Sequence, residues 1–288
     1  MMTLTKETLQ ICYRPMTEDD LTAAYSLSQL VKWPHRIDDW KLVHHLGTGF
    51  IAEYNQESIG TVLCWNHGDH YASLGMVIVS PEKQGNGIGR KLMERVLEKI
   101  GDQKNVLLFA TPSGQPLYES FGFRAASKVY QHQAIVEASN SVDANLTKMQ
   151  RQILQADHAK IVELAETSCG LAREAALNEI LKSATGIVTE SQGEITGFAI
   201  IRKFGRGYAI GPVIASSQEQ AKAMIQSLIN QHINEFVRID VPQSSQLSIW
   251  LEEIGLPQVD TVVEMIRGDM PQRDNTLRQY ALINQALG

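Results

Sequence analysis

The pattern of hydrophobic and polar positions in the first half of the chain predicts strands that alternate with helices. Ile88, Leu92 and Ile100 recur at helical spacing, so an amphipathic helix is expected there. Thr17, followed by acidic residues, is typical of a helix start. We expect strands at about 9–14, 49–54, 60–66, 71–79, 106–111 and 123–133, with helices at about 17–30, before Gly47, at 88–100 and at 116–122. This order indicates an α/β fold built on a mixed sheet.

The same pattern occurs twice along the chain. An offset of 137 positions takes Asp20 to Asp157 and aligns further identical residues without a gap. "GFIAEYNQESIGTVLCW" (49–65) corresponds to "GIVTESQGEITGFAIIR" (186–202), and each segment reads as a hairpin. The other identities include Arg36/Arg173, Glu53/Glu190, Gly60/Gly197, Gly68/Gly205 and Tyr71/Tyr208. We therefore predict two tandem copies of one fold, residues 1–138 and 145–288, joined by the polar segment 137–147.

Composition and charge narrow the class of protein. The chain has 288 residues, of which 43% are hydrophobic and 20% charged, as expected of a folded protein with a substantial core. The net charge of −6 and the lack of a Lys/Arg cluster argue against nucleic acid as a partner. With no signal peptide and no apolar run of about 20 residues, we predict a cytoplasmic protein without a membrane segment.

Cysteine and histidine give no sign of a disulfide framework or a metal site. Cys12, Cys64 and Cys169 are widely spaced and form no CxxC pair. His44 and His45 are adjacent, so they would point to different faces of a helix rather than to one ion. We expect no bound metal.

The segment "SPEKQGNGIG" (80–89) carries the strongest candidate chemistry. A hairpin turn does not explain it, because an amphipathic helix follows instead of a strand. The dinucleotide pattern G-x-G-x-x-G fails, since Arg90 stands where the third glycine is required. What remains is Q-x-x-G-x-G between a strand and a helix, where backbone N–H groups and the helix N-terminus can hold a phosphate.

This strand, loop and helix resemble motif A of the GNAT superfamily of acyl-CoA-dependent N-acetyltransferases. The resemblance covers about residues 9–133 and implies that the loop backbone binds the pyrophosphate of acetyl-CoA, while the preceding strand pairs with its pantetheine arm. The implied coenzyme-binding residues are Val77, Ile78, Val79, Gln84, Gly85, Asn86, Gly87, Ile88, Gly89 and Arg90.

A second motif supports the same resemblance. "PLYESFGF" (116–123) is similar to the closing "LYxxxGF" motif of the family, which makes Tyr118 the implied proton donor to the departing thiolate. The alternative for Tyr118 is a core tyrosine in a short amphipathic helix. The fourth strand, "YASLGMVIV", lacks the carboxylate that serves as base in many relatives. The nearest polar candidates are Glu53, His67, Asp69 and His70, and we favour a base acting through water.

The resemblance also suggests where the acceptor binds. The family frames its acceptor pocket with the loop between the first two helices, here "VKWPHRIDDW" (31–40). Trp33 and His35 could form an aromatic wall and Asp38 could pair with a cationic amine, although the tryptophans could equally pack the helices and the charge be solvated. Further candidates are Thr111 and Ser113 after the fifth strand and Asp240 in the second copy.

The second copy has lost the chemical features of the first. Its segment "IASSQEQAKAMIQ" (214–226) contains no glycine, and Leu251 stands opposite Tyr118. It resembles the degenerate C-terminal domain of some tandem bacterial acetyltransferases, which implies that it completes the acceptor pocket and replaces a dimer partner. We expect a monomer or a weak homodimer.

Together these features predict an N-acetyltransferase that moves an acetyl group from acetyl-CoA to a primary amine of a small molecule by direct attack. Two alternatives stay open at this point. One is a protein or peptide N-acetyltransferase with the same chemistry. The other is a non-catalytic acyl-CoA-binding sensor, against which the presence of Tyr118 argues.

Overall fold

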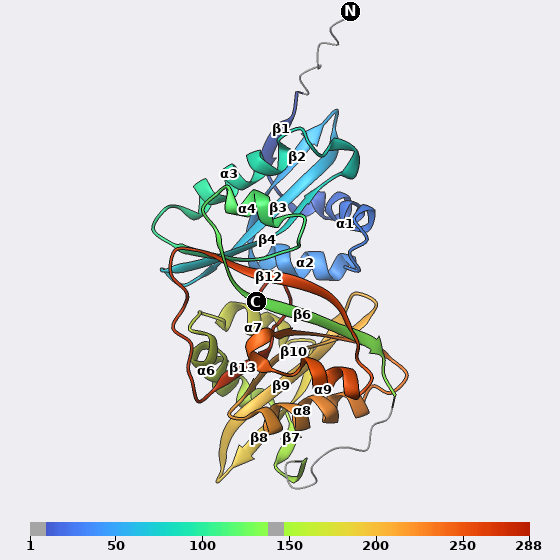
Figure 1. Cartoon of the computed structure of the whole chain (residues 1–288), viewed down its shortest axis with the longest axis vertical. Helices are drawn as coiled ribbons and strands as arrows, with labels where there is room; N and C mark the ends of the chain where they lie inside the picture. Colours follow the sequence, from blue (N-terminus) through green and yellow to red (C-terminus); the bar gives the residue numbers. More distant parts are fainter. Residues whose placement is uncertain (1–9, 138–146) are drawn as a thin grey trace, which may run out of the picture.

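The computed structural model describes residues 10–137 and 147–288, so most of the predicted linker lies outside the described residues. Thirteen strands form one mixed sheet that runs through the length of the molecule (Figure 1). The strands follow the order β1-β2-β3-β4-β5-β12-β6-β11-β10-β9-β8-β7, and β13 pairs with β10. The predicted mixed α/β sheet is confirmed.

The first copy forms the upper part of Figure 1, and its elements begin and end within a few residues of the predicted positions. They are β1 (Cys12–Pro15), α1 (Leu21–Leu30), α2 (Ile37–Leu46), β2 (Thr48–Tyr54), β3 (Glu57–His67), β4 (Tyr71–Val79), α3 (Ile88–Ile100), β5 (Asn105–Ala110), α4 (Gln115–Glu119) and β6 (Arg124–Ile135).

The second copy repeats this order in the lower part of the molecule, which confirms the tandem duplication. Its elements are β7 (Gln150–Gln152), α6 (His158–Cys169), α7 (Glu174–Ile180), β8 (Thr185–Ser191), β9 (Glu194–Phe204), β10 (Gly207–Ala215), α8 (Gln218–Asn230), β11 (Phe236–Pro242), α9 (Ser248–Glu253), β12 (Gln258–Arg267) and β13 (Arg278–Ala281).

The two copies exchange their last long strands, which the sequence did not predict. β12, from the second copy, lies between β5 and β6, and β6, from the first copy, pairs with β11. Figure 1 shows β6 and β12 crossing the middle of the molecule side by side. The predicted ranges 1–138 and 145–288 therefore describe the order of the chain, whereas each half of the sheet contains a strand from the other copy.

A shared hydrophobic core joins the two copies at this crossing. The helices α1, α2, α6 and α7 contribute to a single cluster that contains Leu27 and Trp40 from the first copy with Leu164 and Phe198 from the second. Trp40 and Phe198 are completely buried. Burial on this scale fixes the copies against each other, because separating them would expose large apolar side chains to water.

The tips of two equivalent hairpins reinforce the junction. Gly205, between β9 and β10, has a φ of +54° and lies so close to Pro34 that an added Cβ would be 3.1 Å from the Pro34 oxygen. At the related place, a Cβ added at Gly68 would lie 3.9 Å from the Ala172 Cβ, so this approach is less close. Each copy thus places a hairpin against the loop between the first two helices of the other copy.

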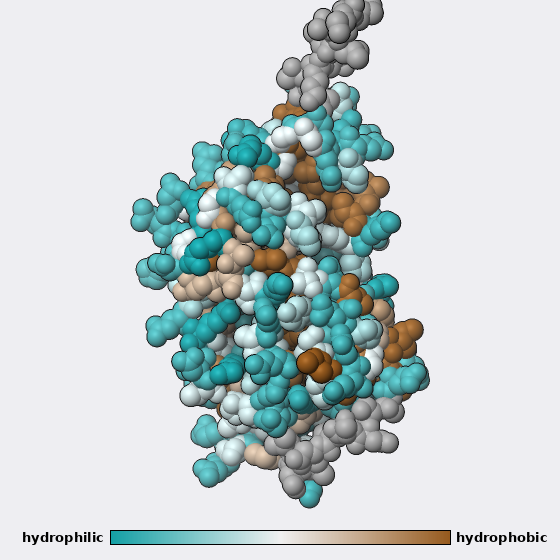
Figure 2. All heavy atoms as spheres, in the orientation of Figure 1, coloured by the Kyte–Doolittle hydropathy of each residue, from teal (hydrophilic) through white to brown (hydrophobic). Residues whose placement is uncertain are grey.

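The face of the molecule seen in Figure 2 is mainly polar. In the view of Figure 2 hydrophilic side chains cover most of the face, and hydrophobic side chains occur in separate small groups. Among the described residues, no helix has both the length and the apolar character needed to cross a membrane.

Candidate active site

The strands β4 and β5 open a gap in the first copy. They are paired only from Tyr71 to Ser73, opposite residues 105–107, and diverge beyond that point. A bulge at Met76, which has a φ of +52°, shifts the register of β4 against β3, and the hydroxyl of Thr61 donates a 2.7 Å hydrogen bond to the Met76 carbonyl. The divergence leaves the edge of residues 74–79 available to an extended ligand.

The glycine-rich loop follows this edge directly. Gly85 and Gly87 both have a φ of +77°, a conformation that glycine adopts without steric cost, and Gly87 is the N-cap of α3. The first helical hydrogen bond runs from the Lys91 N–H to the Gly87 carbonyl, so the preceding N–H groups of α3 are free for a ligand. An added Cβ at Gly85 or Gly87 would meet no described atom within 4 Å. The loop is therefore an open cradle suited to an anion.

Side chains of the loop stabilise its conformation through hydrogen bonds to backbone carbonyls. The Gln84 amide donates to the Val79 carbonyl at 3.2 Å, and the Asn86 amide donates to the Lys83 carbonyl at 3.0 Å. Arg90 donates to the Ser120 hydroxyl at 3.0 Å, which ties α3 to α4. These contacts leave the backbone N–H groups, rather than the side chains, as the main donors for a phosphate.

A cavity of about 640 Å³ lies beside the gap between β4 and β5. Its walls come from both copies and from the last residues of the chain, which end at the centre of the molecule in Figure 1. The first copy supplies Tyr25, Gln29, Lys32, Trp33, Pro34, His35, Arg36, Leu74, Gly75, Met76, Val77, Leu108, Phe109, Thr111, Tyr118, Gln131 and Gln133; the second supplies Phe204, Gly205, Arg206, Arg238, Asp260, Asn284, Gln285 and Ala286. The β4 bulge at Met76 therefore borders the same cavity as the Tyr118 side chain.

Tyr118 is the predicted catalytic residue, and its side chain lines this cavity. The residue is only 8% exposed, and burial raises its pKa to about 12, so the phenol stays protonated at neutral pH. Phe123 packs edge-on at 6.3 Å between ring centroids, and the absence of a side chain at Gly114 leaves room for the Tyr118 ring. No described protein group hydrogen-bonds the hydroxyl.

The structure brings together three of the six predicted acceptor residues. Trp33, His35 and Thr111 line the cavity. Three other candidates do not line it. Asp38 is exposed and pairs with Lys41, Ser113 is exposed and contacts Thr111 at 3.2 Å, and Asp240 is buried behind the wall.

His35 is neutral in its pocket. Burial lowers its pKa to about 4, and the charges of Arg238 and Arg202 act in the same direction, whereas Asp39 opposes them. The ring contacts Phe204 edge-on at 5.3 Å, and its Nδ1 is buried with no hydrogen-bond partner among the described residues. A neutral imidazole in a cavity can accept or donate one hydrogen bond.

The residues considered as direct bases lie elsewhere. Glu53 accepts a 2.6 Å bond from Arg14, which also binds Asp20, and the second copy repeats this arrangement with Arg151, Asp157 and Glu190.

His67 is buried between the Ser73 hydroxyl at 2.8 Å and the Ala172 carbonyl at 3.2 Å, and burial lowers its pKa to about 3. Asp69 and His70 lie in the turn between β3 and β4. Among the described residues, Asp260 is the only carboxylate that lines the cavity.

The second copy fills the equivalent gap with its own chain. β10 and β11 are paired from Tyr208 to Ile210 and then diverge, as β4 and β5 do. In this case β13 enters the gap, with Val213 opposite Ala281, and the Leu282 N–H donates to the Asp240 carbonyl at 2.9 Å. A ligand cannot occupy the same edge.

The second copy has also lost the glycine loop, because only residues 216 and 217 connect β10 to α8, whereas residues 80–87 connect β4 to α3. α8 begins at Gln218 with Ser217 as N-cap, and its hydroxyl accepts a hydrogen bond from the Gln220 N–H. Ala221, Met224 and Gln226, which align with the loop of the first copy in sequence, are buried inside this helix. This short connection cannot form the open cradle of the first copy.

Sequence reasoning missed the cationic part of the cavity wall. Arg206 follows the hairpin tip of the second copy, and Arg238 lies two residues before Asp240 on the same face of β11. The last residues, Asn284 to Ala286, reach the cavity only because β13 enters the gap beside β10. Neither placement has a signal in the pattern of a single copy.

Comparison with protein families adds the identity of the fold. The description "Acetyltransferase (GNAT) domain" applies to two matches, at residues 45–125 and 161–281. The chain carries two GNAT domains in tandem. It is an acyltransferase of the GNAT type, and the resemblance seen in its glycine loop is confirmed at the level of the family.

Individual relatives extend over most of this GNAT protein. "Uncharacterized N-acetyltransferase YitH" of Bacillus subtilis is 29% identical over 222 residues, 75% of this chain and 76% of its own length. "Holothin acyltransferase" of Pseudoalteromonas sp. is 24% identical over 261 residues, 84% of this chain and 82% of its own. A crystal structure of a putative acetyltransferase from Pyrococcus horikoshii has a TM-score of 0.80 at 20% identity and covers 99% of this chain and 98% of its own. The whole tandem fold is therefore shared.

Proposed function

We propose that the protein transfers an acetyl group from acetyl-CoA to a primary amine of a small molecule, with the first copy as the catalytic domain. One observation carries this proposal. The cavity of about 640 Å³ joins the free edge of β4 to the Tyr118 side chain and to walls from both copies. That volume lies within the range of roughly 300–1,000 Å³ that is typical of small-molecule sites.

The loop and the strand fit acetyl-CoA. The backbone of residues 84–90 would hold the pyrophosphate, and Val77, Ile78 and Val79 lie on the diverging strand that would align the pantetheine arm. The thioester would then reach the cavity beside Met76, since that residue lines it. The neighbouring N–H groups of the α3 N-terminus favour negative charge at the phosphate position.

The chemistry assigned to Tyr118 is that of a general acid. The amine nitrogen attacks the acetyl carbonyl carbon, a C–N bond forms and the C–S bond breaks. Tyr118 gives its proton to the departing sulfur and recovers one from solvent, while the attacking nitrogen releases its own proton to water. Because the pKa of Tyr118 is raised to about 12, the phenol does not act as a base at neutral pH.

Small molecules fit the cavity better than proteins do. The loop before α2, the hairpin tip at Gly205 and the C-terminal residues Asn284 to Ala286 surround it. The relative named as an acyltransferase for holothin is consistent with a small acceptor. A protein N-acetyltransferase stays the second candidate and would require a peptide to enter between the two copies.

The test is turnover with acetyl-CoA. The full chain is incubated with acetyl-CoA and separate panels of small primary amines and of peptides, and acetylated products are identified by mass spectrometry while free thiol is quantified. We expect products among the small amines and a large loss of rate in Tyr118→Phe. Acetylation of peptides alone would favour the second candidate, and tight binding of acetyl-CoA without any product would favour a sensor.

A further inference from the structure

We propose that the small-molecule acceptor carries an oxyanion group, a carboxylate or a phosphate, in addition to its reacting amine. Arg238, Arg206 and Lys32 would hold this group at the cavity wall. The inference rests on the proposed function, because it specifies the acceptor of the same site. It departs from the usual expectation for a cationic amine, which is a pocket lined by carboxylates.

The balance of charge at the cavity is the first observation. Four cationic side chains line it, Lys32, Arg36, Arg206 and Arg238, against the single carboxylate of Asp260 among the described residues. The chain as a whole has a net charge of −6, so this concentration of positive charge runs against the average of the protein. Clefts lined by one sign of charge attract ligands of the opposite sign.

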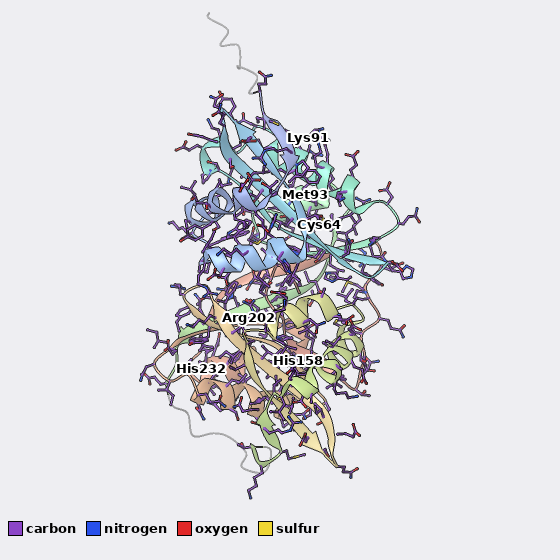
Figure 3. The ribbon with its side chains drawn as sticks, turned by 180° about the vertical axis from the view of Figure 1, so that it is seen from behind. Cys64, Lys91, Met93, His158, Arg202 and His232 are labelled. Atoms are coloured by element: carbon purple, nitrogen blue, oxygen red, sulfur yellow. The ribbon has the colours of Figure 1, made fainter. Side chains whose placement is uncertain are left out.

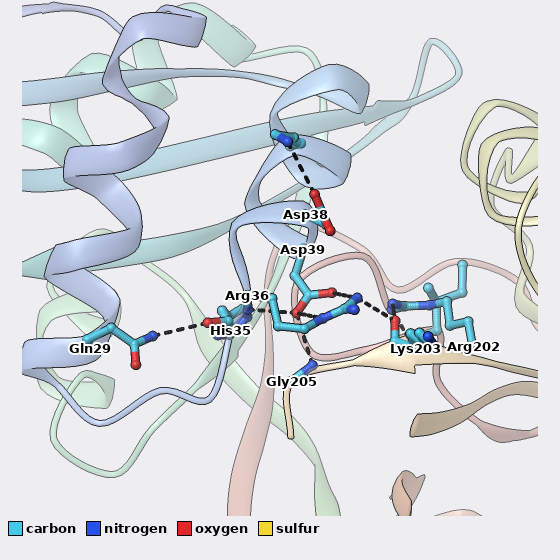
Figure 4. Close-up of polar contacts among 10 residues, drawn as sticks. Gln29, His35, Arg36, Asp38, Asp39, Arg202, Lys203 and Gly205 are labelled. Carbon is cyan, nitrogen blue, oxygen red and sulfur yellow. Dashed lines mark hydrogen bonds and ion pairs between the residues drawn. The ribbon is translucent and has the colours of Figure 1, made fainter. Parts of the chain in front are cut away.

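Two of these cations already have carboxylate partners behind the wall. Arg36 pairs with Asp39 at 2.9 Å, and Arg238 pairs with Asp240 at 2.9 Å. Figure 4 shows the Asp39 carboxylate between Arg36 and the Gly205 N–H. Lys32 and Arg206 are exposed at the cavity, and no described carboxylate lies within ion-pair distance of either. Neither charge is neutralised by a carboxylate, and the Arg206 guanidinium contacts the Phe236 ring, 4.4 Å from the ring centroid.

Arg238 is held in position to bind an oxyanion. Its side chain is 8% exposed, and Asp240 accepts from Nε at 3.1 Å and from Nη2 at 3.0 Å. Gln285 in turn donates to Asp240 at 3.0 Å. Nη1 has no hydrogen-bond partner among the described residues. A fixed guanidinium with a free donor binds carboxylate or phosphate at little further entropic cost.

A second buried guanidinium adds to the positive field. Arg202 and Arg238 are both paired to Ala209 across β10, so they lie in one row of the sheet. The Phe204 ring lies 5.0 Å from the Arg202 guanidinium and 5.4 Å from that of Arg238. Figure 3 places Arg202 at the junction of the two copies. No described carboxylate lies within ion-pair distance of Arg202. Burial lowers the pKa of Arg202 to about 10, so its guanidinium stays charged at neutral pH.

The coenzyme does not account for these cations. The residues of the phosphate cradle, 84–90, do not line this cavity, and the cations lie on the α1–α2 loop and on the second copy. The same field disfavours the protonated form of the acceptor amine. It would lower the pKa of that amine and raise its reactive neutral fraction, in a cavity where Asp260 is the single carboxylate among the described residues.

The experiment compares amines that differ in charge at one position. Ethanolamine, β-alanine, O-phosphoethanolamine and 1,2-diaminoethane are offered singly and in equimolar competition with acetyl-CoA, together with the corresponding sets of longer chain length. We expect kcat/KM for an anionic member to exceed that of its neutral partner by tenfold or more, and the diamine to be the poorest. The better of β-alanine and O-phosphoethanolamine identifies the oxyanion.

Variants of the exposed cations test the cause of the preference. Lys32→Gln and Arg206→Gln should each lower kcat/KM for anionic amines about tenfold more than for neutral amines. Arg206→Lys should keep much of the preference, and Lys203→Gln is the matched control, because Lys203 is exposed on the same hairpin but does not line this cavity. The preference should also shrink as salt screens the exposed charges.

Failures of the two proposals are distinguishable. Turnover of neutral amines or diamines in preference to anionic ones would overturn this inference and leave the proposed function intact. A strong preference for succinyl-CoA over acetyl-CoA with neutral amines would also overturn this inference, because the cations would then serve the acyl group, and it would replace the acyl donor of the proposed function. Absence of any acetylated amine, with acetyl-CoA bound, would overturn both.

Discussion

Both copies have a sheet in which two neighbouring strands diverge, but the opening between these strands is free in the first copy and filled in the second. In the first, β4 and β5 diverge after Ser73 and leave a free edge, whereas in the second the equivalent opening beyond Ile210 is filled by β13. The strand that closes the second opening also carries the last residues of the chain to the wall of the first cavity. The C-terminal segment that begins with β13 therefore both closes the opening of the second copy and completes the cavity of the first.

The ion pairs give the opposite case, because the same arrangement occurs in both copies. Arg14 binds Asp20 and Glu53, and Arg151 binds Asp157 and Glu190 in the same way. A feature repeated in a copy without the glycine loop serves the fold rather than the chemistry. Features present in one copy alone, the glycine loop and Tyr118, are the ones that we assign to function.

The largest expected effect concerns the two buried tyrosines that differ between the openings. Tyr118→Phe should lower kcat about 10²- to 10⁴-fold, because a proton donor to the thiolate is lost. Tyr280→Phe, in the strand that fills the second opening, should leave kcat nearly unchanged. Steady-state kinetics of both variants provide the comparison, and equal losses would contradict the assignment of catalysis to the first copy.

Truncation of the Tyr280 side chain in β13, which fills the second opening, should lower the free energy of unfolding more than it lowers activity. Tyr280 is 4% exposed and packs in the core of the second copy, so Tyr280→Ala should reduce the free energy of unfolding by about 3 kcal/mol. Tyr118→Ala should cost less, because that side chain borders the larger cavity, about 640 Å³ against about 320 Å³ beside Tyr280. Denaturant titrations of both variants would measure the difference, and the reverse order would show that the first opening is the more tightly packed.

The repeated ion pairs should respond alike to acid. Hydrogen bonds from Arg14 lower the pKa of Asp20 from 3.8 to about 2, and Arg151 lowers that of Asp157. A lowered pKa stabilises the folded state at neutral pH by about 2 kcal/mol for Asp20, and this stabilisation is lost as the pH falls from about 4 to about 2.

The stability difference between the wild type and Asp20→Asn should therefore disappear over that range, as should the difference for Asp157→Asn. Thermal unfolding followed from pH 7 to pH 2 measures both. A difference that persists at pH 2 in either variant would mean that packing, rather than the ion pair, accounts for the loss.

The smallest effects concern the two hairpin tips. Gly205→Ala and Gly68→Ala should each cost about 1 kcal/mol, because both glycines have positive φ. Only Gly205 borders the cavity and approaches Pro34 closely, so only that variant should also lower kcat/KM for the acceptor, by up to about tenfold. Equal kinetics in the two variants would contradict a role of this tip in shaping the cavity.

Much of the fold followed from the sequence because it depends on local patterns. The spacing of Ile88, Leu92 and Ile100 predicted α3, and the identities around Gly60 and Gly197 predicted the duplication. The exchange of β6 and β12 was not predictable in this way. Strand order depends on pairing between distant segments, and both strands have the same pattern whichever neighbour they choose.

The residues of the candidate site show the same difference between local and long-range features. The glycine loop and Tyr118 each lie within one short motif, so the sequence could indicate them. Arg206 and Arg238 reach the cavity through packing of one copy against the other, and Asp38 appeared suitable from its loop position but turns outward to Lys41. Residues that line a site by tertiary packing leave no local signal.

The central claim is that one copy, and only one, binds the acyl donor. Isothermal titration of the full chain with acetyl-CoA tests it most directly, using Gly87→Glu and, as the matched control, Gly193→Glu in the second copy, where the glycine also has positive φ and open space around it. We predict one site per chain, lost in Gly87→Glu and retained in Gly193→Glu. Two sites per chain, or undiminished binding by Gly87→Glu, would contradict the account.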